Sequence, residues 1–416
     1  MGFAMKRLHR CVVLTIILGL VSLPLPAMAG TKKGNPRDVP TAGIEFAKTA
    51  TQITGIAISP LLGVGAVGAY QWFSAHTDQE RAALPWFANP VFWFPCLALV
   101  IACAFKDSFG TMIPPGLKKP FDALETAENK LTGLVTAGAV VPELVNSMSK
   151  ALVNASPSGA IGGPHVGGLA MLHIGAMDFS WLLDIAMVPL AVAIFAVVWL
   201  ASHTINVLIL LSPWGAVDAA LKAARTSLLG LLTITAWIDP RAAAVLSLII
   251  IIFAYFIAGW SFRLTVYGTI FCWDFFTLRR TRFTLHPEAN KVFTARQIGE
   301  VPIRTYGRLH QTPEGVLIFR YRPWLVLPVR ELTVQRAGLV VGRGVFYSVV
   351  LDPDGMSGAT RTLFLLPPRY RGHEDTFVRA YRLGGTVDVG LRRAWNWLRE
   401  AVGLGPKQPA VAGVVT

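Results

Sequence analysis

The most prominent pattern along the chain is a series of long apolar stretches in its first two thirds. Uncharged runs cover residues 49–74, 82–105 and 242–262, and the run 179–211 holds a single acid. A bilayer requires about 20 apolar residues in a helix. A fifth run, 131–141, has only eleven residues, which fits either a span or a re-entrant segment equally well. The pattern predicts an all-α membrane bundle of four or five spans over residues 30–276.

The N-terminus has the pattern of a secretory signal peptide. Basic residues Lys6, Arg7 and Arg10 precede the apolar residues 11–23, and an Ala-x-Ala site ends at Ala29. This order of a basic, an apolar and a small-residue region is typical of a segment that is removed after export. We therefore predict a signal peptide over residues 1–29, with an uncleaved anchor as the alternative.

After residue 277 the apolar period changes from helical to alternating. The predicted strands are 281–286, 301–309, 315–321, 325–329, 331–335, 338–341, 346–352 and 360–366. A helical pattern over 387–402 follows them, since apolar side chains recur there at steps of three and four. We expect a mainly-β soluble domain over 277–403, which resembles a pleckstrin-homology-like barrel in architecture; another small barrel is the alternative. Residues 404–416 are expected to form a flexible tail.

Composition and charge support this division. The chain is 53% hydrophobic and 15% charged, with a mean hydropathy of +0.51, whereas soluble domains are about 25% charged. Residues 277–416 hold 21 Lys and Arg against 10 Asp and Glu, which supplies most of the net charge of +14. Basic surfaces beside a membrane are attracted to anionic lipids of the cytoplasmic leaflet. The predicted lipid contacts are Arg279, Arg280, Arg282, Arg392 and Arg393.

The distribution of basic residues predicts the orientation of the chain. Cytoplasmic loops of membrane proteins carry an excess of Lys and Arg, so the arginine-rich domain is expected in the cytoplasm of a bacterium, below a multi-pass inner-membrane bundle. With an external N-terminus this needs an odd number of spans. A five-span chain in which every apolar run crosses would leave the four lysines of the segment 106–130 outside, against the same rule.

A weak internal repeat recurs after about 150 residues. Ser59-Pro60 and then Asn89-Pro90 precede one apolar run, and Ser212-Pro213 and then Asp239-Pro240 precede another. Transporter folds often carry such symmetry, with broken helices at matching positions. Both dipeptides are also common helix starts, so a chance recurrence is equally compatible with the pattern.

Four polar residues within the apolar runs are the candidate intramembrane site: Asp184, His203, Asn206 and Arg263. An ionisable group at the centre of a membrane helix costs about 2.5–3.5 kcal/mol on insertion scales. Asp184 lies near a helix end, and Arg263 can extend to the headgroups. His203 and Asn206 lie deep in one helix, three residues apart, where they either form interhelical hydrogen bonds or line a solute or proton pathway.

The segment between the second and third runs carries a candidate motif that includes Asp107, Asp122 and Thr126. Asp122, Glu125 and Asn129 share one helical face here, and Gly133 follows in the apolar helix. With this pattern, residues 50–145 resemble the family called domain of unknown function 4126, uncharacterised bacterial membrane proteins. Asn129-Lys130 stands where that family has Arg-Pro, and Lys106-Asp107 has the reverse order. The resemblance implies a multi-span protein without an assigned activity.

No sequence motif indicates catalysis or cofactor binding. The four cysteines lie in apolar runs, His165 and His173 lie on a Gly-rich segment, and no nucleophile elbow or phosphate-binding loop occurs. We expect no catalytic residue, cofactor, metal site or nucleic-acid partner. The leading hypothesis is a membrane-embedded scaffold or regulatory module whose basic domain contacts lipids, a protein partner or a second copy. The alternative is a small-solute or ion transporter or channel with a cytoplasmic accessory domain.

Overall fold

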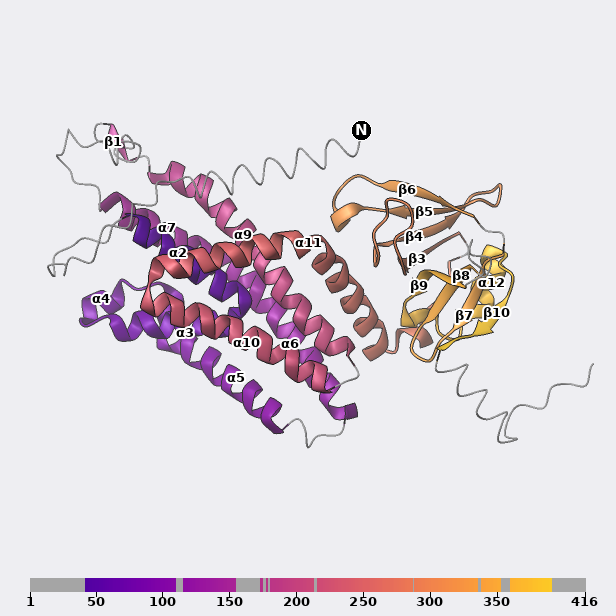
Figure 1. Ribbon diagram of the computed structural model, residues 1–416, viewed down its shortest axis with the longest axis horizontal. Helices are drawn as coiled ribbons and strands as arrows, with labels where there is room; N and C mark the ends of the chain where they lie inside the picture. The colour runs from indigo at the N-terminus through magenta and orange to yellow at the C-terminus, as the bar shows by residue number, and fades with distance from the viewer. Residues whose placement is uncertain are drawn as a thin grey trace, which may run out of the picture.

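The computed structural model describes residues 42–109, 115–154, 173–174, 177–178, 180–212, 215–286, 288–335, 338–352 and 360–390. It shows a helical region followed by a β-sheet region (Figure 1). The predicted signal peptide, His165, Arg392, Arg393 and the tail lie outside the described residues.

The helical region begins with short helices and ends with long ones. The elements are α2 (Ala42–Ile58), α3 (Pro60–Ser74), α4 (Asp78–Ala82), η1 (Trp86–Ala88), α5 (Pro90–Phe109), α6 (Pro115–Val135), η2 (Thr136–Val140), α7 (Val141–Asn154), α9 (Ser180–Leu211), α10 (Gly215–Ile238) and α11 (Pro240–Phe276). A small hairpin, β1 (His173–Ile174) with β2 (Met177–Asp178), precedes α9. Pro60, Pro90 and Pro240 each open a helix, where the missing N–H of proline costs nothing.

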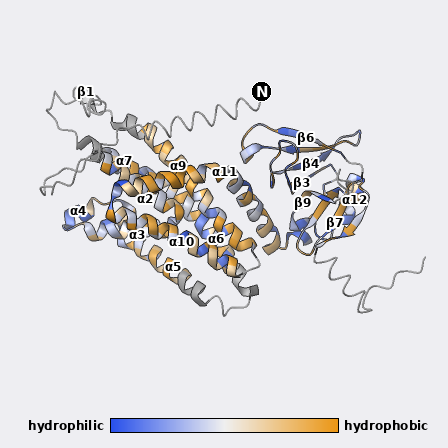
Figure 2. Cartoon of the chain, in the orientation of Figure 1, coloured by the Kyte–Doolittle hydropathy of each residue, from blue (hydrophilic) through white to orange (hydrophobic). Residues whose placement is uncertain are grey.

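Three helices of the described chain are long and apolar enough to cross a membrane: Phe121–Ser149, Ile185–Leu211 and Pro240–Phe276. The segment Pro90–Cys103 is a shorter apolar helix. Figure 2 shows hydrophobic residues dominating α9 and α11, whereas α6 also carries hydrophilic residues. The prediction of a helical region with several helices fit to span a membrane is confirmed, whereas the number of spans stays a prediction. The run 131–141 is part of a longer helix, because the π-helical turn η2 joins α6 to α7 without a break.

Helices α2 and α3 form a hairpin with its tip inside the bundle. The chain reverses at Ser59-Pro60, and a Cβ added at Gly63 would lie 2.6 Å from the Cα of Ile56. The outer ends of both helices lie at the end of the bundle remote from the sheet (Figure 1). With 17 and 15 residues, at about 1.5 Å per residue, each helix is too short to cross a bilayer alone.

Helix α11 presents an apolar stripe to the outside. Val245, Ile249, Phe253, Phe256 and Trp260 are exposed by 37–67% and follow one another at steps of three or four, which places them on one helical face. Its other face packs in the bundle core with α2, α7 and α9. An outward stripe of this kind fits a helix solvated by lipid.

The C-terminal region is an open, mixed sheet of eight strands in the order β10-β7-β8-β9-β3-β4-β5-β6. The strands are β3 (Ala289–Thr294), β4 (Tyr306–Gln311), β5 (Leu317–Tyr321), β6 (Arg330–Val334), β7 (Val340–Arg343), β8 (Ser348–Asp352), β9 (Arg361–Leu366) and β10 (Thr386–Asp388). The prediction of a small barrel is wrong. β7 takes β10 as a parallel partner instead of β6, so β6 and β10 remain as two edges.

Several predicted strand positions are also wrong. Residues 281–286 and 325–329 form no strand; the second range lies in the connection that contains the 3-10 turn η4 (Pro323–Leu325). β3 and the helix α12 (Glu374–Tyr381) were not predicted, and Val387, predicted to begin the last helix, lies in β10. Alternation alone does not distinguish a strand from an extended loop, because only pairing with a neighbour decides between them.

Aromatic side chains fill the sheet core. Phe319, Phe364, Tyr370, Phe377 and Tyr381 are nearly inaccessible to solvent. The Tyr381 hydroxyl donates to the carbonyl of Leu309 at 2.8 Å, and burial raises the pKa of Tyr381 to about 12. The hydroxyl therefore keeps its proton, and α12 stays attached to the sheet.

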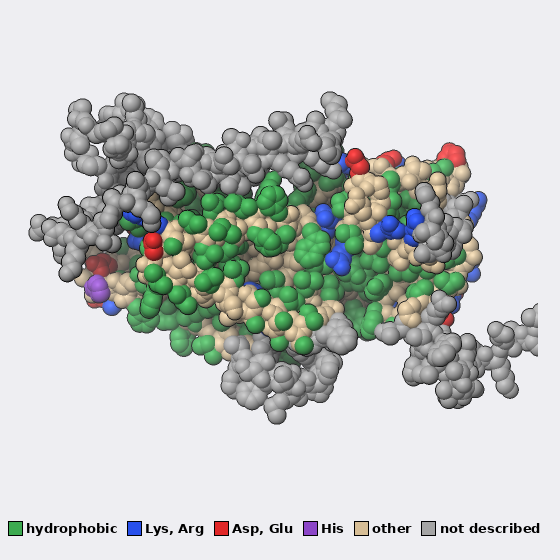
Figure 3. All heavy atoms as spheres, viewed as in Figure 1, with side chains coloured by type: hydrophobic (Ala, Val, Ile, Leu, Met, Phe, Trp, Pro, Cys, Tyr) green, Lys and Arg blue, Asp and Glu red, His purple; other side chains and the backbone are tan. Residues whose placement is uncertain are grey.

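The sheet is attached to the helical region through the C-terminal half of α11. Tyr267 and Phe271 of α11 share a buried cluster with Phe293 of β3. Beside it, the Arg369 guanidinium donates to the carboxylate of Asp274 at 2.5 Å, and neither side chain is more than 7% exposed. In Figure 3, Lys and Arg side chains gather where the bundle meets the sheet and over the sheet, while hydrophobic side chains cover the visible face of the bundle.

We expect Arg369→Leu to release the sheet from α11. Removing one partner of a buried ion pair costs up to about 3–5 kcal/mol, and Asp274 would keep only the more distant Arg279, whose Nη1 lies 3.8 Å from Oδ1. Hydrogen exchange of purified protein should show faster exchange in the second half of α11 and in β3. The matched control is Arg320→Leu, which breaks a pair with Glu331 whose side chains are 47% and 50% exposed and costs about 1 kcal/mol at most. Equal exchange in both variants would contradict the role of this pair.

Candidate functional site

Polar side chains from three helices meet inside the bundle at the tip of the α2–α3 hairpin. We call this group the polar cluster; its members are Asp122, Glu125, Thr126 and Asn129 of α6, Ser202, His203 and Asn206 of α9, and Lys222 and Arg225 of α10. Six of them, all except Glu125, Lys222 and Arg225, are less than 9% exposed. The cluster lies nearer to the end of the bundle that carries the sheet, since Ser202 is nine residues from the end of α9.

Helical spacing brings these residues to one place. Asp122, Glu125 and Asn129 recur at steps of three and four along α6, as do Lys222 and Arg225 along α10, so each set shares one helical face. The face of α6 that the sequence indicated therefore points into the bundle, toward α9 and α10. The opposite face carries Leu124, Leu131 and Leu134, which are 66–68% exposed.

His203 is the most buried member of the cluster. Its Nδ1 lies 2.8 Å from Oδ1 of Asn129, and its ring stacks on the Trp199 indole with centroids 5.0 Å apart. Because an amide oxygen only accepts, Nδ1 carries the proton in this pair and Nε2 keeps a lone pair. Among the described residues Nε2 has no hydrogen-bond partner. The imidazole thus keeps a buried acceptor without a partner in the described part of the chain.

Gly133 gives Trp199 its position. A Cβ at residue 133 would collide with Nε1 of the indole, and the same Nε1 lies 3.4 Å from the carbonyl of Asn129. Only a residue without a side chain allows α6 and α9 to approach this closely. The glycine that belongs to the sequence motif therefore supports the stacked His203 ring.

Arg225 binds the broken end of α2. Its Nε donates to the carbonyl of Ile58 at 3.0 Å, and its Nη1 donates to Oδ1 of Asn206 at 2.7 Å. The Ser202 hydroxyl donates to the same carbonyl at 2.5 Å. The last turn of a helix leaves carbonyls without partners and carries a partial negative charge, so a guanidinium is a suitable partner for the end of α2.

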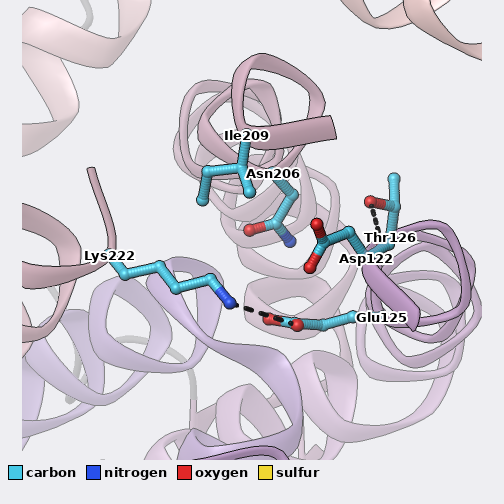
Figure 4. A pocket seen from close by; sticks show the side chains of 6 residues that line it. All are labelled: Asp122, Glu125, Thr126, Asn206, Ile209 and Lys222. Carbon is cyan, nitrogen blue, oxygen red and sulfur yellow. Dashed lines mark hydrogen bonds and ion pairs between the residues drawn. The ribbon is translucent and has the colours of Figure 1, made fainter. Parts of the chain in front are cut away.

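A small recess opens beside these contacts. Asp122, Glu125, Thr126, Asn206, Ile209 and Lys222 line it (Figure 4). Lys222 forms an ion pair with Glu125 at 3.5 Å, and the side chains of Asp122 and Asn206 point toward one another. The recess has room for about one water molecule.

Acidic and basic groups face each other across this part of the bundle. Glu125 of α6 pairs with Lys222 of α10, and Asp122 of α6 lines the same recess. Lys130, one turn further along α6, donates to the Thr269 hydroxyl of α11. Buried charges persist only where partners compensate for lost hydration. The arrangement can exchange internal partners for a small polar solute or an ion.

The other predicted site residues lie away from the cluster. Arg263 donates from Nε to the carbonyl of Ile303 at 2.9 Å and so binds the sheet region. Asp184 lies in the first turns of α9, at the opposite end of that helix from His203, and Asp107 lies near the end of α5. Arg279, Arg280 and Arg282 follow α11 and are exposed. Of the four predicted intramembrane residues, only His203 and Asn206 meet in the cluster.

Sequence reasoning missed Lys222 and Arg225. Their helix, α10, was not predicted, because its charges interrupt the hydropathy that identifies membrane spans. The signal was present in the spacing of Asp218, Lys222 and Arg225, which places all three on one helical face.

The described residues contain no group of three His, Cys, Asp or Glu side chains suited to a metal ion. No family model, curated protein or solved structure matches the chain. The likeness to the domain of unknown function 4126 therefore stays a prediction.

We expect Arg225→Leu to destabilise the helical region. The substitution removes the donor to Oδ1 of Asn206 and leaves the Ile58 carbonyl with Ser202 alone, and a buried polar group without a partner costs about 1–3 kcal/mol. The melting temperature in detergent, followed by near-ultraviolet circular dichroism, should fall. Arg81→Leu is the control, because its ion pair with Asp78 lies on α4, outside the cluster, between side chains that are 39% and 100% exposed, and such a pair stabilises by about 1 kcal/mol at most. A melting temperature lowered equally by both variants would contradict a special role of Arg225.

Proposed function

We propose that this chain is a membrane transport protein whose polar cluster binds a small polar solute or an ion. One observation carries the proposal: charged and polar side chains of α6, α9 and α10 converge on the broken tip of a helical hairpin. Ionisable groups within membrane helices are costly and usually mark functional sites. A bundle that served only as an anchor would need no such group.

Unsatisfied polar atoms support binding at this position. Nε2 of His203 and Nδ2 of Asn206 are buried and have no hydrogen-bond partner among the described residues. A buried polar atom without a partner costs about 1–3 kcal/mol. A water molecule, or a solute with both a donor and an acceptor, would recover this free energy.

The hairpin supports the same proposal. In many transporters, discontinuous helices place their free backbone groups at the substrate site. Here the end of α2 directs the carbonyl of Ile58 into the cluster, where Arg225 and Ser202 bind it. A cation could replace the guanidinium at this carbonyl, and an anion could bind the released guanidinium.

On the side remote from the sheet, the cluster adjoins the apolar core of the bundle, which includes Ile56, Val64 and Phe195. Passage therefore requires a second arrangement of these helices. The π-helical turn η2 of the α6–α7 helix is a suitable place for it, because such turns weaken the regular hydrogen-bond ladder and are frequent at functional sites.

Proton and sodium flux into proteoliposomes tests the proposal. A trapped pH-sensitive dye and a sodium-sensitive dye would report entry driven by an imposed membrane potential. We expect flux with the unmodified protein and about a tenfold or greater loss in His203→Ala and Asn206→Ala, since a polar contact of about 1–3 kcal/mol corresponds to about a tenfold to hundredfold change.

The control for the flux experiment is His76→Ala. His76 is exposed and lies on the connection between α3 and α4, outside the three helices that supply the cluster. This variant should retain full flux. Absence of both fluxes, together with normal growth of cells that carry the two cluster variants, would argue against transport.

We further propose an orientation in a bacterial inner membrane with the sheet region in the cytoplasm. α5, the joined α6–α7, α9, α10 and α11 would then cross the membrane, and the α2–α3 hairpin would enter and leave on the outer side. In Figure 1, α5 ends and α6 begins at the end of the bundle near the sheet. The lysine-rich segment 106–130 would then begin on the same side as the arginines, as the excess of basic residues in cytoplasmic loops requires.

Reporter fusions after Thr416 measure this orientation. A reporter active only in the cytoplasm should give a signal, and one active only outside it should remain silent. The same pair of reporters inserted after Thr77, in the connection between α3 and α4, should give the opposite result. An external signal at Thr416 would exclude this orientation.

A second candidate function is a scaffold or regulatory module on the cytoplasmic leaflet. The observation that favours it is the attachment of the sheet, which the buried pair of Arg369 and Asp274 holds against α11. The exposed Arg279, Arg280 and Arg282 follow α11 directly and could contact anionic lipid. Transport and a surface role are compatible, because the polar cluster and the sheet use different residues.

A further inference from the structure

We infer that the connection between β5 and β6, residues 323–329, inserts into the lipid bilayer beside α11. We call it the apolar loop. The inference rests on the membrane placement within the proposed function but not on transport. It assigns a lipid contact to apolar residues of the sheet region, whereas all the lipid contacts predicted from the sequence are arginines.

The apolar loop exposes large hydrophobic side chains at its tip. Trp324, Leu325, Val326, Leu327 and Val329 are 44–78% exposed, with Val326 the most exposed. No charged residue interrupts the sequence between Arg322 and Arg330. Soluble proteins rarely expose a continuous apolar group of this kind, and such patches mark sites for a partner or a membrane.

The position of the loop identifies lipid as its partner. The Trp324 ring lies 4.8 Å from the Phe262 ring of α11, and a Cβ at Gly259 would lie 3.9 Å from the Trp324 indole. The apolar part of α11, from Ala242 to Phe262, is about 30 Å long at about 1.5 Å per residue, the thickness of the hydrocarbon core. Trp324 therefore lies where that part of α11 ends.

Charge at the base of the loop agrees with this position. Arg322 and Arg330 flank the loop and are exposed, and Arg263 follows Phe262 on α11. Trp is enriched at the membrane interface, and arginines beside it are attracted to anionic headgroups. The loop thus has an apolar tip between two basic residues, as an interfacial anchor requires.

The backbone of the loop is fixed in an unusual conformation. Trp324 and Leu325 have φ values of 55° and 62°, a left-handed region that costs roughly 1–2 kcal/mol for residues with a Cβ. Hydrogen bonds from Leu325 to the Arg322 carbonyl at 3.0 Å and from Leu327 to the Pro323 carbonyl at 3.1 Å hold the turn. The fold therefore retains a strained turn that keeps apolar side chains outward.

Spin labels on the full-length protein test the inference. The four native cysteines are replaced by alanine, and single cysteines are introduced as Val326→Cys, Phe253→Cys and Glu314→Cys. In vesicles of phosphatidylethanolamine and phosphatidylglycerol, collision rates are measured with oxygen, which partitions into lipid, and with a water-soluble nickel chelate. We expect the oxygen-to-nickel ratio at Val326 to be several-fold higher than at Glu314 and close to that at Phe253.

The two reference positions separate the possible failures. Phe253 is 65% exposed on the apolar stripe of α11, and Glu314 is exposed on the connection between β4 and β5. A lipid signal at Phe253 with a water signal at Val326 overturns the inference alone, whereas water signals at both overturn the membrane placement. Label–label broadening at Val326 without contact to oxygen would indicate a second copy of the chain, and would also overturn it.

Discussion

The structure depends on one constraint: backbone carbonyls freed by a helix break inside the bundle must find donors. In lipid no water supplies them, and each unsatisfied group costs several kcal/mol. At Ser59-Pro60 the freed carbonyl of Ile58 binds Arg225 and Ser202. The guanidinium in turn requires acceptors and neighbouring acids, so one helix break accounts for charged residues on two other helices.

A second consequence concerns the connection between the two regions. α11 continues beyond its apolar part, and its last turns supply Tyr267, Phe271 and Asp274 to the contact with the sheet. The sheet is therefore joined to the helical region by a packed contact with α11 and not by a flexible linker. A movement of α11 within the bundle would be transmitted to the sheet, and binding at the sheet could alter the bundle, because packed elements move as units. This rigid connection makes a combined transport and surface function mechanically reasonable.

The two ends of the helical bundle differ in polarity. Toward the sheet, the bundle contains charged and polar side chains and a recess; toward the other end, it contains the apolar core around Phe195. The apolar loop lies at the polar end beside Phe262. A solute that enters from the sheet side would reach the polar cluster first. The apolar loop would hold the sheet against the membrane surface on that side.

The sequence by itself determined the helical class of the first two thirds, the breaks at Ser59-Pro60 and Asp239-Pro240, and the polar face of α6, because hydropathy, proline geometry and helical period are local properties. It did not determine the open edges of the sheet, the partner of Arg263 or the inclusion of Arg225 in the cluster. These depend on which distant segments pack together. Strand pairing and the compensation of buried charge are contacts between segments far apart in the chain, so only the tertiary structure decided them.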